Sequence, residues 1–111
     1  MSPYIPQKGD FISVDFDPQS GHEQKGRRPA IVISNNLISE YTDMVIVCPI
    51  TSTDREYPFH VTIKNNPDVY GFVMVDQVKS IDYKTRKVKY IGRASSDILE
   101  EVLAVLDSCI Y

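Results

Sequence analysis

Two runs of consecutive apolar residues constrain the fold of this chain more than any other feature. The first is Ala30-Ile31-Val32-Ile33, within residues 29–34, and the second lies in residues 44–50. Successive side chains of a strand point to opposite faces, so a strand that is apolar throughout must bury both faces. The β-branched residues in both runs also favour extended backbone. We therefore expect these two segments to form the centre of a β-sheet.

Five further segments have strand character. Residues 10–16 and 59–64 alternate apolar and polar side chains, and residues 71–75, 78–82 and 87–91 are short runs bounded by turn residues. Regularly spaced short strands with turns between them are typical of a small β-barrel or sandwich. The chain is therefore expected to be mostly β.

The C-terminal part of the sequence changes to a helical period. Five apolar residues fall on one stripe of a helix: Ile98, Leu99, Val102, Leu103 and Leu106. Ser95 or Ser96 can cap the first turn of this helix. A shorter helical turn is expected within residues 35–41.

Length and composition predict a single domain over residues 1–111, because domains typically contain about 100 to 150 residues. Apolar residues make up 42% and charged residues 24%, close to the average for soluble proteins. No stretch approaches the roughly 20 apolar residues of a membrane span, and the N-terminus lacks the layout of a signal peptide. We expect the protein to stay in the cytoplasm.

The two cysteines do not form a recognisable metal or redox motif. Cys48 lies in a strand-like run and Cys109 near the C-terminus, with no CxxC pair or His-rich segment beside either. We interpret them as buried or incidental thiols rather than disulfide partners or metal ligands. No metal and no cofactor are expected.

Positive charge gathers in one part of a chain whose formal net charge is -3. Residues 79–93 contain six basic side chains and a single acid, Asp82. The basic residues are Lys79, Lys84, Arg86, Lys87, Lys89 and Arg93. This segment is either an electrostatic contact surface for nucleic acid or a solvated hairpin face, and composition does not separate the two.

The segment between the first two expected strands carries unusual chemistry. Residues 21–29 hold an imidazole, a carboxylate, an amide and three cations. Pro29 favours an extended backbone at Arg28, so the Arg28 side chain should leave the loop at a defined angle. A guanidinium held there could form paired hydrogen bonds with phosphate oxygens.

These residues belong to a longer pattern that resembles the MazF/PemK/Kid toxin endoribonucleases. The upstream part reads Gly9-Asp10, then Asp17-Pro18, then Gly21-His22-Glu23-Gln24-x-Gly26-x-Arg28-Pro29. Downstream, Pro49-Ile50-Thr51-Ser52 resembles the strand-end motif with its functional Thr, and residues 76–82 resemble the later Asp-Gln strand pair. The resemblance covers essentially the whole chain, in order and without large gaps.

The resemblance implies an SH3-like barrel with a C-terminal helix that works as a homodimer. It also implies a metal-independent endoribonuclease that cuts single-stranded mRNA, leaves 2',3'-cyclic phosphate and 5'-hydroxyl ends, and so stops translation and growth. A cognate MazE-like antitoxin with a flexible acidic tail would lie along the RNA groove and block it.

Site residues follow from the resemblance one by one. Arg28 matches the catalytic Arg, Thr51 the active-site Thr, and Glu23 and Gln24 the Glu-Gln pair beside them. One branch of the family also uses a His and the later Asp, which are His22 and Asp76 here. That branch has an Arg two residues before the Asp, where this chain has Met74. The difference favours an Arg28–Thr51 arrangement over an acid–base pair centred on Asp76.

RNA chemistry supports the same arrangement, because the 2'-hydroxyl of RNA is itself the nucleophile and no metal is obligatory. Arg28 would stabilise charge on the nonbridging oxygens, and Thr51 would donate a second hydrogen bond. Glu23 or His22 would move protons, with base and acid not assigned. We expect RNA contacts from a further set of residues: Gln24, Lys25, Arg27, Asp76, Gln77 and Lys79.

Each of these residues also has a purely structural interpretation. Arg28 could simply pair with Glu23, and Thr51 could cap its own turn. Gln77 could form a hydrogen bond inside the barrel. Tyr57 and Phe59 could stack on bases, although core packing is favoured for Phe59. His60 alternates with core positions and is expected to be exposed.

The sequence leaves two other functions open. A CcdB-like toxin shares the barrel and acts by binding DNA gyrase, but it relies on a C-terminal Trp, and this chain has no Trp. A noncatalytic RNA-binding barrel would use the basic residues 79–93 without cutting.

Overall fold

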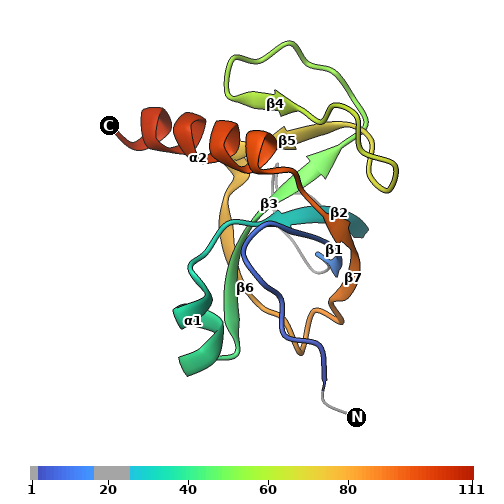
Figure 1. The fold of residues 1–111 in the computed structure, drawn as a ribbon, viewed down its shortest axis with the longest axis vertical. Helices are drawn as coiled ribbons and strands as arrows, with labels where there is room; N and C mark the ends of the chain where they lie inside the picture. The colour runs from blue at the N-terminus through green and yellow to red at the C-terminus, as the bar shows by residue number, and fades with distance from the viewer. Residues whose placement is uncertain (1–2, 17–25) are drawn as a thin grey trace.

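The computed structural model describes residues 3–16 and 26–111, which form a seven-stranded antiparallel sheet with a C-terminal helix (Figure 1). The strands are β1 (Asp10–Asp15), β2 (Arg27–Val32), β3 (Met44–Thr51), β4 (His60–Thr62), β5 (Phe72–Met74), β6 (Lys79–Asp82) and β7 (Lys89–Arg93). The helical segments are α1 (Asn36–Tyr41), the 3₁₀ turn η1 (Val75–Gln77) and α2 (Ser96–Ile110). All the strands and helices expected from sequence are confirmed, with ends that shift by a few residues.

Strand β3 organises the sheet because it pairs with three other strands. One edge pairs with β2, in the register Ala30↔Pro49 and Val32↔Val47. The other edge pairs first with β6 and then, at its C-terminal end, with β5. The strand order is β4-β5-β3-β2-β1-β7, with β6 branching from β3. In Figure 1 the strands curl as in a small barrel, but the ladders between described residues leave the sheet open.

Both faces of the central strands are buried, as their continuous apolar sequences predict. The face under α2 carries one hydrophobic cluster, which includes Phe11, Ile31, Cys48, Ile50, Val61, Val73, Ile98 and Val102. The opposite face carries a second cluster: Ile12, Val14, Phe16, Ala30, Val32, Val45, Val47, Ile81 and Tyr83. Neighbouring residues of β1, β2 and β3 therefore alternate between two separate cores.

Helix α2 covers the first cluster. Its N-terminal amide at Ile98 donates to the Ser95 side chain at 3.2 Å, which confirms a serine cap. Ile98 and Val102 are its buried residues, four positions apart on one stripe. The short helix α1 is capped in the same way, because the Leu37 amide donates to the Asn35 side chain at 2.9 Å.

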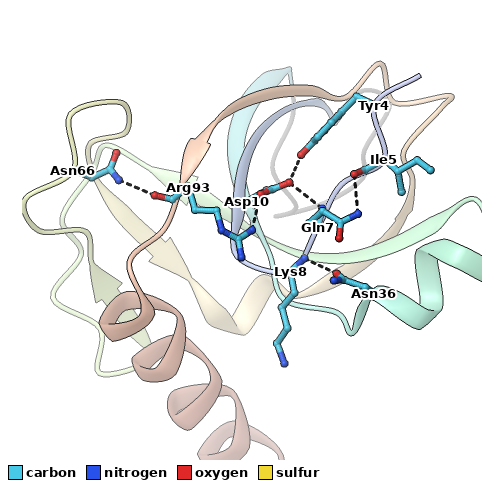
Figure 2. Close-up of polar contacts among 8 residues, drawn as sticks. All are labelled: Tyr4, Ile5, Gln7, Lys8, Asp10, Asn36, Asn66 and Arg93. Atoms are coloured by element: carbon cyan, nitrogen blue, oxygen red, sulfur yellow. Dashed lines mark hydrogen bonds and ion pairs between the residues drawn. The ribbon is translucent and has the colours of Figure 1, made fainter. Parts of the chain in front are cut away.

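A buried carboxylate fixes the N-terminal segment to the sheet (Figure 2). Asp10 is only 4% exposed, yet both of its oxygens have partners. The Tyr4 hydroxyl and the backbone amide of Gln7 donate to Oδ2, the latter at 2.9 Å, and Arg93 donates to Oδ1 at 2.8 Å. Because the carboxylate is fully hydrogen-bonded, its burial is tolerated. Asp10 thereby joins residues 4–7 to β7.

Both cysteines are free thiols, as expected. Cys48 is buried in the first cluster, and this burial raises the pKa of its thiol to about 12. Cys109 is exposed on the last turn of α2. Within residues 3–16 and 26–111 no group of side chains has the composition of a metal site. None of the helices in this part of the chain has the length and apolar character needed to cross a membrane.

Tyr4→Phe should lower the free energy of unfolding by about 1–2 kcal/mol at neutral pH, because it removes one hydrogen bond to a charged, buried group. Burial and the neighbouring Asp10 carboxylate raise the pKa of Tyr4 above its ordinary value. A raised pKa in the folded state stabilises the protein below about pH 10, and this contribution is lost as the pH rises further. Urea unfolding at pH 7 and pH 11 measures both effects. Tyr41→Phe, at an 85% exposed position, should change neither.

Candidate active site

Arg28 and Thr51 are brought toward each other by the pairing of β2 with β3. The register joins Ala30 to Pro49. The last pair of this ladder lies two residues from Arg28 in β2 and two residues from Thr51 in β3, so both residues lie just beyond the same end of the β2–β3 pairing. Arg28 is half-buried and also pairs with Val14 of β1, so its backbone is held on the other edge.

The Thr51 side chain is oriented by its own turn. Thr51 is 8% exposed, and its Oγ1 accepts a hydrogen bond from the Thr53 amide at 3.2 Å. This contact is the turn-capping role that sequence alone suggests. It uses the hydroxyl as an acceptor and leaves the hydroxyl hydrogen available for donation. The cap therefore positions Thr51 without preventing it from donating to an anion.

Gly71 permits the close approach of β5 to Thr51. Its φ is +128°, and a Cβ at this position would lie 2.3 Å from the Thr51 carbonyl oxygen. Its own carbonyl accepts from the Ile63 amide at 2.9 Å, which ties it to the end of β4. No side chain can be accommodated here without moving Thr51. Sequence reasoning missed this residue, since a glycine at a strand end is an ordinary turn signal.

Two of the expected RNA-contacting cations have defined partners. Arg27 donates to the Lys87 carbonyl, which links the start of β2 to the turn between β6 and β7. The Lys79 ammonium lies 5.6 Å from the centroid of the Phe16 ring, a cation–π contact. Phe16 in turn donates its amide to the Gly26 carbonyl at 2.9 Å. Both cations are therefore held close to the N-terminal start of β2.

The expected exposure of His60 is wrong. Its side chain is only 5% exposed, and its Nε2 lies 3.3 Å from Oδ1 of Asp76. The chain turns back before β4, where the His60 amide donates to the Tyr57 carbonyl at 3.1 Å. This turn brings the Tyr57 and Phe59 rings to 5.1 and 5.4 Å from the imidazole. The alternation of side chains along a strand cannot reveal this burial, because the residues that bury His60 belong to the neighbouring loop.

The remaining predicted residues divide into two groups. Asp76 and Gln77 lie in η1, the first exposed and the second half-buried. His22, Glu23, Gln24 and Lys25 lie outside the described residues. Their roles stay predictions.

The open antiparallel sheet and the C-terminal helix match the fold of MazF, a toxin of bacterial toxin–antitoxin systems. The family described as "PemK-like, MazF-like toxin of type II toxin-antitoxin system" matches residues 7–110. The chain belongs to this PemK/MazF family.

Individual relatives span the whole chain. Endoribonuclease toxin MazF of Escherichia coli K12 is 36% identical over 107 residues, which cover 96% of each protein. Endoribonuclease toxin ChpB of the same strain is 38% identical over 109 residues, covering 94% of this chain and 93% of ChpB. The crystal structure of MazF from Deinococcus radiodurans superposes with a TM-score of 0.92 at 38% identity, covering 97% of this chain and 98% of that one. A MazE–MazF complex from D. radiodurans gives 0.86 at 38% identity, with 97% of both chains covered.

Gly71→Ala is expected to lower the free energy of unfolding by about 3 kcal/mol, because the new methyl group meets a backbone carbonyl and φ is positive. Amide hydrogen exchange at Thr53 should accelerate, since its acceptor on Thr51 is displaced. Gly92→Ala is the control. A Cβ there would lie 2.5 Å from Asp68 Oδ2, which can rotate away, and 3.1 Å from Asp68 Cβ, which needs a shift of only a few tenths of an ångström, and Gly92 does not have a positive φ. Equal effects of the two substitutions would contradict a specific Gly71–Thr51 contact.

Proposed function

We propose that the protein is a toxin endoribonuclease that cuts single-stranded mRNA without a metal and thereby stops translation. The observation that carries this proposal is that the β2–β3 ladder ends two residues from Arg28 and two residues from Thr51, and this supports a site in which a guanidinium and a hydroxyl hold one phosphate. Family membership and the endoribonuclease relatives support it.

The reaction uses the nucleophile that RNA itself supplies. The 2'-hydroxyl loses its proton to a base and attacks the adjacent phosphorus, forming the bond of a 2',3'-cyclic phosphate. The bond from phosphorus to the 5'-oxygen breaks, and an acid returns a proton to this oxygen. Charge develops on the nonbridging oxygens, which Arg28 and Thr51 stabilise with hydrogen bonds set in place by the sheet. Glu23 and His22 are the candidates for moving the protons.

Binding of the RNA strand is assigned to polar groups beside this pair. Arg27 and Lys79 supply positive charge near the entry of β2. Lys25, Gln24, Asp76 and Gln77 complete the predicted contacts. Cations contribute affinity that does not depend on sequence and that weakens with salt, whereas amides read base edges. The side chains that read base edges therefore determine which RNA sequence is recognised.

The partners follow from the same relatives. MazF-type proteins of D. radiodurans crystallise with MazE. We propose that this chain likewise has a cognate antitoxin, whose acidic tail occupies the RNA groove, and that it acts as a homodimer in the cytoplasm. The cations near Arg28 would attract either polyanion, so antitoxin and RNA should compete.

Purified protein should cut a long single-stranded RNA into discrete fragments in the presence of EDTA. Arg28→Ala and Thr51→Val should each lower kcat/KM by about a hundredfold or more, because each removes a hydrogen bond to the transition state. Thr62→Val is the control, an exposed threonine of β4. Electrophoresis and detection of 5'-hydroxyl ends measure the outcome. Tight RNA binding without cleavage would instead indicate a noncatalytic RNA-binding barrel.

In solution the protein is expected to have twice the 12.6 kDa mass of one chain. Size-exclusion chromatography with light scattering measures this mass over a range of concentrations. A monomer at every concentration would contradict the homodimer.

A further inference from the structure

His60 occupies a position where an apolar side chain would pack more easily. It faces Met74 across the β4–β5 ladder, and its ring is enclosed by Tyr57 and Phe59. Its Nε2 reaches Asp76 at 3.3 Å, whereas its Nδ1 is buried and has no hydrogen-bond partner among the described residues. A buried polar atom without a partner disfavours folding. Among the described residues, the contact with Asp76 is therefore the one polar contact that this imidazole makes.

The consequence of that contact is a carboxylate held in a fixed position at the surface. The Asp76 side chain is 37% exposed, and one of its oxygens faces His60. Asp76 also lines an open pocket of about 520 Å³ together with Phe59. The far side of the pocket is the last part of α2, with Val105, Ser108 and Cys109. An aromatic ring and a positioned hydrogen-bond acceptor thus border the same space.

This pocket lies within reach of the candidate active site. Thr51 pairs with Phe72 of β5, and Met74, two residues further along β5, pairs with His60. With a strand spacing of about 4.8 Å and a rise of about 3.3 Å per residue, the Cα atoms of Thr51 and His60 are roughly 12 Å apart. A nucleotide close to the cut can therefore reach Asp76.

The charge of Asp76 indicates which part of an RNA it contacts. A carboxylate accepts hydrogen bonds and donates none, and it repels phosphate groups. It suits the N–H groups on a base edge, as when Asp or Glu accepts from the amino group of cytosine. The flanking Phe59 offers a ring for stacking. An acidic antitoxin tail does not match this chemistry.

We propose that His60 and Asp76 form a base-reading site of the endoribonuclease, an inference that rests on the proposed function. Asp76 accepts a hydrogen bond from the exocyclic amino group of an unpaired guanine, cytosine or adenine stacked against Phe59. His60 is a positioning residue that holds the carboxylate. Uracil, which lacks an amino group, is disfavoured at this one position of the RNA recognition sequence.

Sequencing the 5'-hydroxyl ends of a digested RNA library tests the proposal. Asp76→Asn should reduce the preference for amino-bearing bases over uracil by about tenfold at one position, because the Asn amide can also donate a hydrogen bond to a uracil carbonyl. His60→Leu should relax the same position. His60→Gln, whose amide can donate to Asp76, should retain most of the preference. Asp107→Asn removes an exposed carboxylate outside the pocket and should leave the recognition sequence unchanged.

Three results would overturn the inference. An unchanged recognition sequence in Asp76→Asn and His60→Leu shows that the pair reads no base, while the proposed cleavage stands. A loss spread evenly over all positions shows that the pair is only structural. A wild-type protein that cuts no RNA overturns the proposed function and this inference together.

Discussion

Burial of β3 on both faces is the constraint on which the rest of the structure depends. One strand supplies the central ladder to β2 on one edge and to β6 and β5 on the other. Its alternate side chains enter two separate cores. Such a strand cannot carry polar side chains along its length, so polar chemistry is confined to its end. Thr51 is the last residue of β3, and Arg28 lies close to the facing start of β2.

The candidate site therefore lies at the C-terminal end of β3, where its ladders to β2 and β5 end, and backbone contacts set its geometry. Thr51 is held by a capped turn and by the close approach of Gly71, which tolerates no side chain. Arg28 is held by pairing with β1. Groups positioned in this way need little rearrangement when charge develops on a phosphate, which is the physical basis of electrostatic stabilisation of a transition state.

Two buried polar groups illustrate the difference between a structural and a functional contact. Asp10 has partners on both oxygens: the Tyr4 hydroxyl and the Gln7 backbone amide from the segment just before it, and Arg93 from the distant strand β7. It stabilises the fold and is closed to ligands. Nε2 of His60 lies 3.3 Å from Asp76, which borders an open pocket, and its Nδ1 has no hydrogen-bond partner among the described residues. This difference from Asp10 is the reason why we assign a functional role to the His60–Asp76 pair.

The sequence by itself determined the strands, the C-terminal helix and the two thiols, because periodicity, capping residues and apolar runs are local properties. It also singled out Arg28 and Thr51, which lie in recognisable motifs. Only the tertiary structure decided that Gly71 approaches Thr51, that Tyr4 and Arg93 meet at Asp10, and that a loop buries His60. These contacts join residues that are distant in sequence or lie under a folded-back turn. Strand register and loop closure place them, and a local pattern does not encode either one.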